Sequence, residues 1–509
     1  MSTPSFLDRE RTVAGPGFSR WLVPPAALAI HLCIGQAYAF SVFNLPMTKL
    51  LGITRSAPED WKLTTIGWIF SLAIVFLGLS AAFGGKWLEQ AGPRKAMLAS
   101  AVCFSGGFMI AAVGVWLHQF AIVLAGYGVL GGIGLGLGYI SPVSTLIKWF
   151  PDRPGMATGM AIMGFGGGAM IGSPLAVTWM ARFATSTSVG AAETFIVMGV
   201  LYFALMMFGV LTIRVPPHGW KPQGWVPPAT PRALVTTANV HADQALKTPQ
   251  FWLLWAVLFL NVTAGIGVLG QASAMIQETF PGVISASAAA GFVGLLSLFN
   301  MGGRFAWSSL SDKIGRKATY AIYFLLGAAL YALVPQARSV ALFVAGYALI
   351  MSMYGGGFAT IPAYLRDVFG TMHVSAIHGR LLTAWSAAGV AGPVLVNYLR
   401  EYAIAHGSAG AQAYTTTMYL LAGLLVIGFL CNFVMTPVAA KHHHTGTDVV
   451  AAPVAVQAPE AGGATAVAAA TPPSAVPLAL RIGLAWALVG IPLLWGVSET
   501  VKKSLLLFK

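Results

Sequence analysis

Arg304 is a lone arginine within an apolar stretch of the sequence, residues 285–309. It precedes Asp312 by eight positions, which is about 12 Å of rise along a helix. A guanidinium at that depth must face protein, water or a counter-ion, and the stretch contains no acid to neutralise it. Because arginine presents a planar pair of donors to a carboxylate, we expect Arg304 to line an aqueous cavity and bind an anion. The alternative is a structural arginine that snorkels to the membrane surface or pairs with a loop carboxylate.

Polar residues at helical spacing support the binding interpretation. Ser297, Asn300 and Arg304 stand at offsets 0, 3 and 7, so they lie within about 60° of one another on a helix. Five further residues in other apolar stretches could contact a small anion: His31, Gln36, Tyr38, Tyr127 and Tyr354. His31 is the titratable candidate of the first half. For each of these residues, ordinary helix packing is the alternative role.

The composition indicates that these residues are positioned by membrane-spanning helices. The chain has 509 residues, 57% hydrophobic and 9% charged, and its mean hydropathy is +0.75. Apolar runs of about 20 residues recur along it, each long enough to cross a hydrocarbon core of about 30 Å as a helix. The net charge of +14 is scattered over short loops, so we expect no nucleic-acid partner. The three cysteines lie in apolar runs and predict packing roles rather than a disulfide or a metal site.

Twelve apolar runs fall into two sets of six, separated by a proline-rich break that cannot continue a helix. After the twelfth run comes an Ala- and Pro-rich segment, in which we expect the triplet His442–His444 to be incidental. A thirteenth apolar run follows it. The predicted organisation is an N-terminal tail (1–20), a six-helix bundle (21–215), a linker (216–250), a second six-helix bundle (251–437), a disordered tether (438–476) and an additional transmembrane or interfacial helix (477–509).

Basic residues predict the topology. The loops after the second, fourth, eighth and tenth runs are rich in Lys and Arg, and the last of these loops ends at Arg380, just before an eleventh run that we place at 381–398. The loops on the other side carry fewer of these residues, except the first, where Glu59 and Asp60 offset most of the charge of Lys49, Arg55 and Lys62. By the positive-inside rule, the N-terminus and the linker are cytoplasmic.

One loop pattern occurs in both halves. "GGKWLEQAGPRK" (84–95) follows the second run and "WSSLSDKIGRK" (307–317) follows the eighth, and both read small residue, acid, glycine, base at matching spacing. Such an internal repeat is typical of carriers built from two related halves. The carboxylate of Glu89 or Asp312 can cap a neighbouring helix and pair with a base, so we expect Glu89, Arg94, Asp312 and Arg316 to form a conformational latch.

The repeated loop resembles the signature of the major facilitator superfamily. Within it, four segments resemble the oxalate:formate antiporter family and its monocarboxylate-transporter relatives: "GQAYAFSVF" (35–43), "WFPDRPGMATG" (149–159), "YGGGFATIPAYLRDVFG" (354–370) and "GRLLTAWSAAGVAGP" (379–393). The resemblance implies that Arg304, on the eighth helix, binds the substrate carboxylate. The thirteenth run resembles a small helical subunit found fused to, or beside, such carriers.

Two positions depart from the families' pattern. Where oxalate exchangers have a second cation, a lysine of the eleventh helix, this sequence has Trp385. Where proton-coupled relatives have an aspartate one turn before the arginine, it has Asn300. One buried cation suits a monoanion, because an unpaired carboxylate in a dry cavity is costly. A proton, if one is coupled, would then be carried by His31 or by the acid itself.

The sequence thus predicts an all-α integral membrane protein with two six-helix bundles of the major facilitator type and one extra C-terminal helix. We expect a secondary active transporter of small organic anions, chiefly monocarboxylates such as formate, acetate or lactate-like acids, that works by alternating access as an exchanger or a proton symporter. The alternatives are an oxalate:formate antiporter and a carboxylate sensor that does not transport. We expect no enzymatic activity, since no convergent catalytic set is found, and no cofactor or metal. The expected setting is the plasma (inner) membrane, with the lipid bilayer and a small carboxylate as partners and a monomeric state.

Overall fold

The computed structural model describes residues 5–226, 234–407, 412–444 and 476–508. Within these residues the regular structure is helical, apart from isolated backbone bridges that join Val13 to Val215 and Val240 to His443. Twelve of the described helical segments are long and apolar enough to cross a membrane, and the last helix of the chain is one of them. The prediction of an all-α membrane protein is confirmed.

The first half is built from six membrane-length segments. The first runs through α1 (Val23–Ile34), a 3₁₀ stretch (Gly35–Phe43) and α2 (Asn44–Met47), and the fourth runs through α5 (Phe120–Val123), a π stretch (Leu124–Gly131) and α6 (Gly132–Trp149). The other four are α3 (Leu63–Ala91), α4 (Pro93–Trp116), α7 (Pro154–Phe183) and α8 (Ala191–Thr212). The 3₁₀ and π stretches hold Gln36, Tyr38 and Tyr127, and such irregular turns are frequent at functional sites.

The second half repeats this arrangement after the short helix α9 (Ala242–Ala245) of the linker. Its helices are α10 (Pro249–Thr279), α11 (Ala286–Ile314), α12 (Arg316–Leu333), α13 (Val340–Phe369), the pair α14 (Val374–Leu381) and α15 (Thr383–Ala405), and α16 (Gln412–Phe433). A last helix, α17 (Leu478–Ser504), follows. The remaining short 3₁₀ turns are Arg9–Thr12, Arg20–Leu22, Val334–Gln336, Ala440–His442 and Leu505–Phe508.

The glycines of the repeated loop have a local conformational role. Gly92 separates α3 from α4 and Gly315 separates α11 from α12, with φ of +85° and +90°. A residue with a side chain adopts this backbone region only with strain, so glycine allows each helix to end and the next to begin within one residue. This sharp turn brings the acid before the glycine and the base after it to the same end of the bundle.

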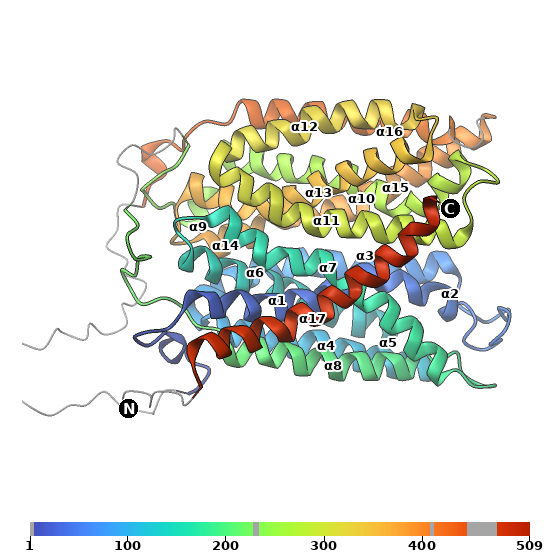
Figure 1. The fold of residues 1–509 in the computed structure, drawn as a ribbon, viewed down its shortest axis with the longest axis horizontal. Helices are drawn as coiled ribbons and strands as arrows, with labels where there is room; N and C mark the ends of the chain where they lie inside the picture. The colour runs from blue at the N-terminus through green and yellow to red at the C-terminus, as the bar shows by residue number, and fades with distance from the viewer. Residues whose placement is uncertain (1–4, 227–233, 408–411, 445–475, 509) are drawn as a thin grey trace, which may run out of the picture.

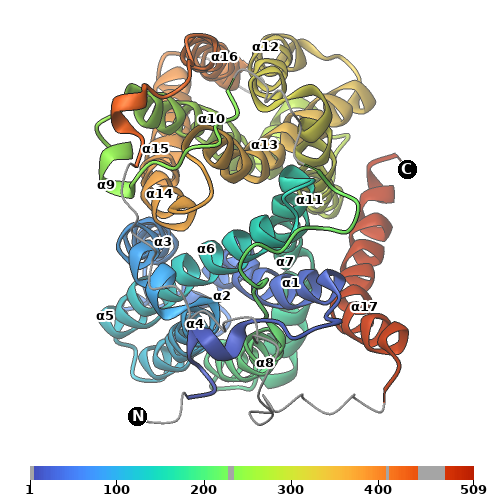
Figure 2. The same ribbon diagram turned by 90° about the vertical axis from the view of Figure 1, so that its left-hand side faces the viewer.

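The two halves pack side by side along their long helices (Figures 1 and 2). The contact between them is made chiefly by α7 against α11 and α13, and by α3 against α14 and α15. The helices of the two halves approach closely at this seam because glycine, which has no side chain, stands at the points of contact. A Cβ on Gly159 of α7 would lie 2.1 Å from the Ser308 hydroxyl of α11, and one on Gly85 of α3 would lie 2.7 Å from the Ala376 backbone of α14.

Two boundaries differ from the sequence prediction. The eleventh segment begins at Val374 rather than 381, because the stretch that reads as a polar loop is the helix α14. Residues 438–444, expected to belong to a disordered tether, are placed against the linker, where the backbone N–H of His444 donates to the Asn239 carbonyl at 2.7 Å. The rest of the expected tether, 445–475, lies outside the described residues.

Candidate anion-binding site

Arg304 lies at the seam between the halves and is fully buried. Its Nε donates to Asn300 Oδ1, one turn earlier on α11, at 3.0 Å, and its Nη1 donates to the Ile162 carbonyl of α7 at 3.4 Å. Nη2 has no hydrogen-bond partner, and no carboxylate pairs with the guanidinium in the described part of the chain. A buried cation in this state is stabilised by an anion that approaches from its open edge.

Aromatic rings enclose the guanidinium. Its central carbon is 5.1 Å from the ring centroid of Phe358 on α13 and 5.6 Å from that of Phe165 on α7, so each half contributes a cation–π contact. The Trp385 ring of α15 packs against both phenylalanines, with centroids 4.6 and 5.2 Å away. Tyr38 joins the cluster 5.1 Å from Phe165. A wall of this kind excludes water and so strengthens every electrostatic contact within it.

Several buried polar atoms around this cluster also lack partners. The indole Nε1 of Trp385 and the Tyr139 hydroxyl have none, and the Tyr139 ring packs 5.2 Å from that of Trp385. The Nε2 atoms of His31 and His378 are likewise without partners, and their rings lie 5.4 and 5.9 Å from Tyr139. Unpaired buried polar atoms are rare in folded proteins because each one carries a desolvation penalty. Their concentration beside a cation is chemistry suited to a small anion.

The structure brings most of the predicted site residues together. Tyr38 and Tyr354, from opposite halves, approach to 3.4 Å between hydroxyl oxygens. Gln36 and Tyr127 behave differently: the Tyr127 hydroxyl donates to Gln36 Oε1 at 3.0 Å, and the Tyr127 ring packs on Phe40 within the first half. These two residues form a polar pair within the first half, and their predicted contact with a small anion stays a prediction.

Sequence reasoning missed Tyr139, His378, Phe165 and Phe358. The sequence predicts that the eleventh helix begins at 381, which leaves His378 in the preceding basic loop, whereas the structure begins this segment at Val374. The signal that could have placed the start of this helix earlier is that His378 stands just before the apolar run and continues its pattern. The two phenylalanines and Tyr139 look like ordinary packing residues in a membrane helix, and nothing in their local sequence separates them from the others.

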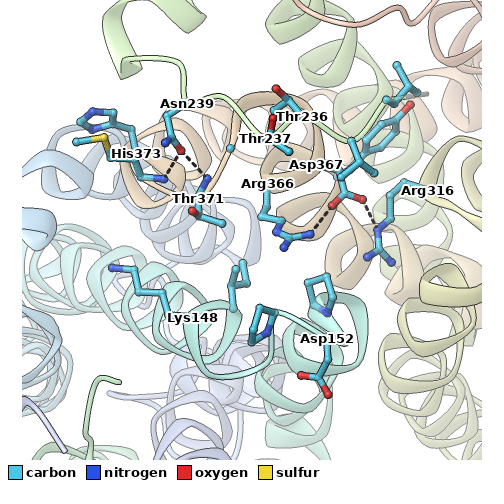
Figure 3. A pocket seen from close by; sticks show the side chains of 18 of the residues that line it. Lys148, Asp152, Thr236, Thr237, Asn239, Arg316, Arg366, Asp367, Thr371 and His373 are labelled. Carbon is cyan, nitrogen blue, oxygen red and sulfur yellow. Dashed lines mark hydrogen bonds and ion pairs between the residues drawn. The ribbon is translucent and has the colours of Figure 1, made fainter. Parts of the chain in front are cut away.

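The acid of the second repeated loop joins the two halves. Asp312, near the end of α11, accepts from the backbone N–H groups of Gly155 and Met156 at the start of α7, at 2.8 and 2.9 Å. Arg316 pairs with Asp312 at 2.6 Å and with Asp367 of α13 at 3.1 Å. Figure 3 shows Asp367 between the guanidinium groups of Arg366 and Arg316. The helix cap predicted for this acid is therefore present, and it crosses the seam.

The first repeated loop makes a weaker version of this contact. Glu89 at the end of α3 accepts from the Ala376 N–H of α14 at 3.1 Å and lies 3.1 Å from His373 Nδ1. Arg94, predicted to join Glu89 in the latch, instead donates to the carbonyls of Phe6 and Ile213, and so it ties the N-terminal segment to the end of α8. This part of the latch prediction is wrong, because the Arg94 guanidinium is buried against these carbonyls and not against the Glu89 carboxylate.

A third tie crosses the seam through the linker. Asp243 of α9 accepts from Lys86 of α3 at 2.8 Å and from Arg380 of α14 at 2.5 Å. Hydrogen bonds from Lys86 and then Arg380 lower the pKa of Asp243 to about 2, so this carboxylate stays ionised at neutral pH. The three acids Asp312, Glu89 and Asp243 thus hold the same end of the bundle together.

A cavity of about 2980 Å³ opens at this latch end, between the two halves and the linker. Its lining includes Lys148, Asp152, Arg366 and His373, which Figure 3 shows around it. Arg304 is not part of the lining. The expectation that Arg304 faces an aqueous cavity is therefore not met in this conformation, because the aromatic rings and the closed latch separate the cation from the opening.

Residues 26–306 match the family model of the Major Facilitator Superfamily, and the chain belongs to this superfamily. It is a multi-pass integral membrane protein of the transporter class. The resemblance inferred from the repeated loop is thereby confirmed, as are the two helical bundles and the additional C-terminal helix.

Relatives and solved structures agree with this assignment. The oxalate:formate antiporter of Oxalobacter formigenes is 29% identical over 383 residues, covering 74% of this chain and 83% of the relative. Apicoplast pyruvate carrier 1 of Toxoplasma gondii is 24% identical over 500 residues, covering 81% and 88%. The crystal structure of the superfamily transporter FucP in its outward conformation is similar in fold, with a TM-score of 0.59 at 13% identity, covering 82% of this chain and 99% of that one.

Proposed function

We propose that the protein is a secondary active transporter of small organic anions and that Arg304 binds the substrate carboxylate. The observation that carries the proposal is a fully buried guanidinium with no carboxylate partner in the described part of the chain, beside other buried polar atoms that lack hydrogen-bond partners. Because Arg304 contacts both halves, the affinity for an anion bound there would depend on the relative position of the two halves. Alternating access, with the latch ends of α7 and α11 separating, would then open this site towards the cytoplasm.

Monocarboxylates are the proposed substrate class. Arg304 is the one permanent cation of the cluster, and the Trp385 ring packs on the two phenylalanines that flank it and extends the aromatic surface. One guanidinium fork matches one carboxylate. A relative that is named a pyruvate carrier fits this assignment, since pyruvate is a monocarboxylate.

Oxalate:formate exchange is the second candidate, favoured by the relative from Oxalobacter formigenes. His31 and His378 flank the aromatic cluster, and their protonated rings would offer Nε2–H donors to a second carboxylate. The two candidates differ in the charge that the site must balance, so competition between substrates separates them.

The test is counterflow in proteoliposomes with a panel of radiolabelled carboxylates. Wild-type protein should exchange internal for external acid, and Arg304→Lys should lower the rate by about tenfold or more, because lysine keeps the charge and loses the planar fork. Arg182→Lys, at the exposed end of α7, is the matched control and should leave the rate unchanged. Binding without counterflow would instead identify a sensor.

We further propose that the N-terminus and the latch lie on the cytoplasmic side and that the setting is the inner membrane. The excess of Lys and Arg in the latch-end loops supports this orientation. The bacterial origin of the oxalate:formate antiporter relative supports the membrane assignment.

A further inference from the structure

The C-terminal helix α17 packs on both halves of the carrier. Its first part contacts the first half: Trp486 Nε1 donates to the Trp21 carbonyl at 3.1 Å, and Val489 is buried with Leu28 and Leu32 of α1. One turn later Leu493 reaches the seam, since a Cβ on Gly167 of α7 would lie within 2.9 Å of both Leu493 and Met301 of α11.

The last part of α17 contacts the second half, at the end of α11 away from the latch. The Ser504 hydroxyl donates to the Gly291 carbonyl at 3.0 Å, and a Cβ on Gly291 would lie 2.4 Å from the Lys503 carbonyl. Thr500 packs on Gly294, and both Thr500 and Ser504 are buried. Glycine at two positions of α11 thus gives α17 a close-fitting place.

The opposite face of α17 is apolar and open. Leu484, Ile491 and Leu494 are 60–69% exposed, as expected for side chains that face lipid. Figure 1 shows the helix crossing the bundle obliquely, and Figure 2 places it at the side of the molecule, next to α1, α7 and α11. One helix of 27 residues, about 40 Å long and with Pro492 inside it, therefore spans the α7–α11 seam from the latch end to the far end.

We propose that α17 is a built-in restraint on alternating access that favours the state with the latch closed. Its first-half contacts begin near the latch end and its second-half contacts lie at the opposite end. The part of α17 after Pro492 contacts both halves by itself, through Gly496 against Ile171 of α7 and through Ser504 on Gly291 of α11. When the latch ends of α7 and α11 separate and their far ends approach, this continuous helical segment cannot keep both sets of contacts. Opening towards the cytoplasm therefore has to break one of them. The inference rests on the alternating-access part of the proposed function and not on the identity of the substrate.

The experiment measures the width of the latch end without substrate. Spin labels are attached at Arg153→Cys and Ile314→Cys, which are both exposed and lie next to the latch ends of α7 and α11. Pulsed electron paramagnetic resonance then measures the distance between the labels in a full-length protein without its native cysteines. Gly496→Leu removes the fit to the first half, since a Cβ there would lie 3.0 Å from Ile171, and Gly291→Leu removes the fit to the second. Each of these two variants should raise the fraction of molecules with a long distance between the two labels, the latch-open state, by at least about threefold.

Gly490→Leu is the matched control, because a Cβ at this position of α17 meets nothing within 4 Å, and it should leave the distances unchanged. A complementary variant strengthens the restraint: a disulfide between Gly294→Cys and Thr500→Cys should lower the long-distance fraction, and a reductant should restore it. Unchanged distances in Gly496→Leu, Gly291→Leu and the oxidised disulfide variant would overturn the proposal. Because no substrate is added, failure of the carboxylate assignment would leave this result unaffected.

Discussion

At the scale of single residues, the site combines one charge with a dry aromatic surrounding. Arg304 donates to an amide and a backbone carbonyl, which are neutral acceptors, and two phenylalanine faces flank it. These contacts orient the guanidinium but do not neutralise it. Arg316 presents the opposite case, a buried arginine that is already paired with two carboxylates.

This contrast gives a prediction about stability. Arg304→Ala should abolish transport and the substrate-induced rise in Tm while changing the Tm of the empty protein little, because no carboxylate loses its partner. Arg316→Ala leaves Asp312 and Asp367 without their common cation and should destabilise the empty protein by about 3 kcal/mol or more. Thermal unfolding of the detergent-purified variants measures both. A loss of stability in Arg304→Ala as large as that in Arg316→Ala would make Arg304 a structural residue.

A second prediction concerns proton coupling through His31. If uptake is stimulated by an imposed pH gradient, His31→Ala should lose the stimulation and keep substrate exchange, because no acid stands at Asn300 to carry the proton. The measurement uses a pH at which the substrate is fully ionised, so that the acid itself cannot bring the proton. His378→Ala serves as the comparison. Stimulation that persists in His31→Ala would exclude His31 as the carrier of the proton.

At the scale of elements, the repeated loops act through helix ends. Asp312 satisfies two backbone N–H groups at the start of α7 and is paired with Arg316, whereas Glu89 satisfies one at the start of α14. A carboxylate at a helix N-terminus stabilises it through both hydrogen bonds and the helix dipole. The two latches are therefore alike in design and unequal in strength.

The inequality can be measured with the spin labels at positions 153 and 314. Asp312→Ala should increase the latch-open population more than Glu89→Ala does, because it removes two caps and an ion pair rather than one cap and a histidine contact. Glu401→Ala, at an exposed site of α15, is the control and should have no effect. An equal or larger effect of Glu89→Ala would show that the second loop is not the dominant latch.

At the scale of the whole molecule, selectivity depends on how many charges the two halves bring to the seam. Within the aromatic cluster the first half contributes Phe165 and Tyr38, and the second half contributes Arg304, Phe358 and Trp385. With one permanent cation, formate, acetate or lactate-like acids should compete better than oxalate for uptake. Competition assays in proteoliposomes test this. Oxalate that binds about tenfold tighter than every monocarboxylate, a difference of ~1.4 kcal/mol, would favour the oxalate:formate candidate instead.

The sequence by itself determined the helices, the two halves, the repeated loops and the depth of Arg304, because these follow from local composition and spacing. Only the tertiary structure decided which side chains gather around Arg304, that Arg94 turns away from Glu89, and that α17 crosses the seam. The physical reason is that lipid is as apolar as a helix interface, so the hydrophobic pattern does not report which face of a membrane helix is buried. In α3, Leu77 is fully buried and Leu79 is 41% exposed, although both are leucines of one apolar run. The rotation of each helix, and hence the site, is set by packing between segments far apart in the chain.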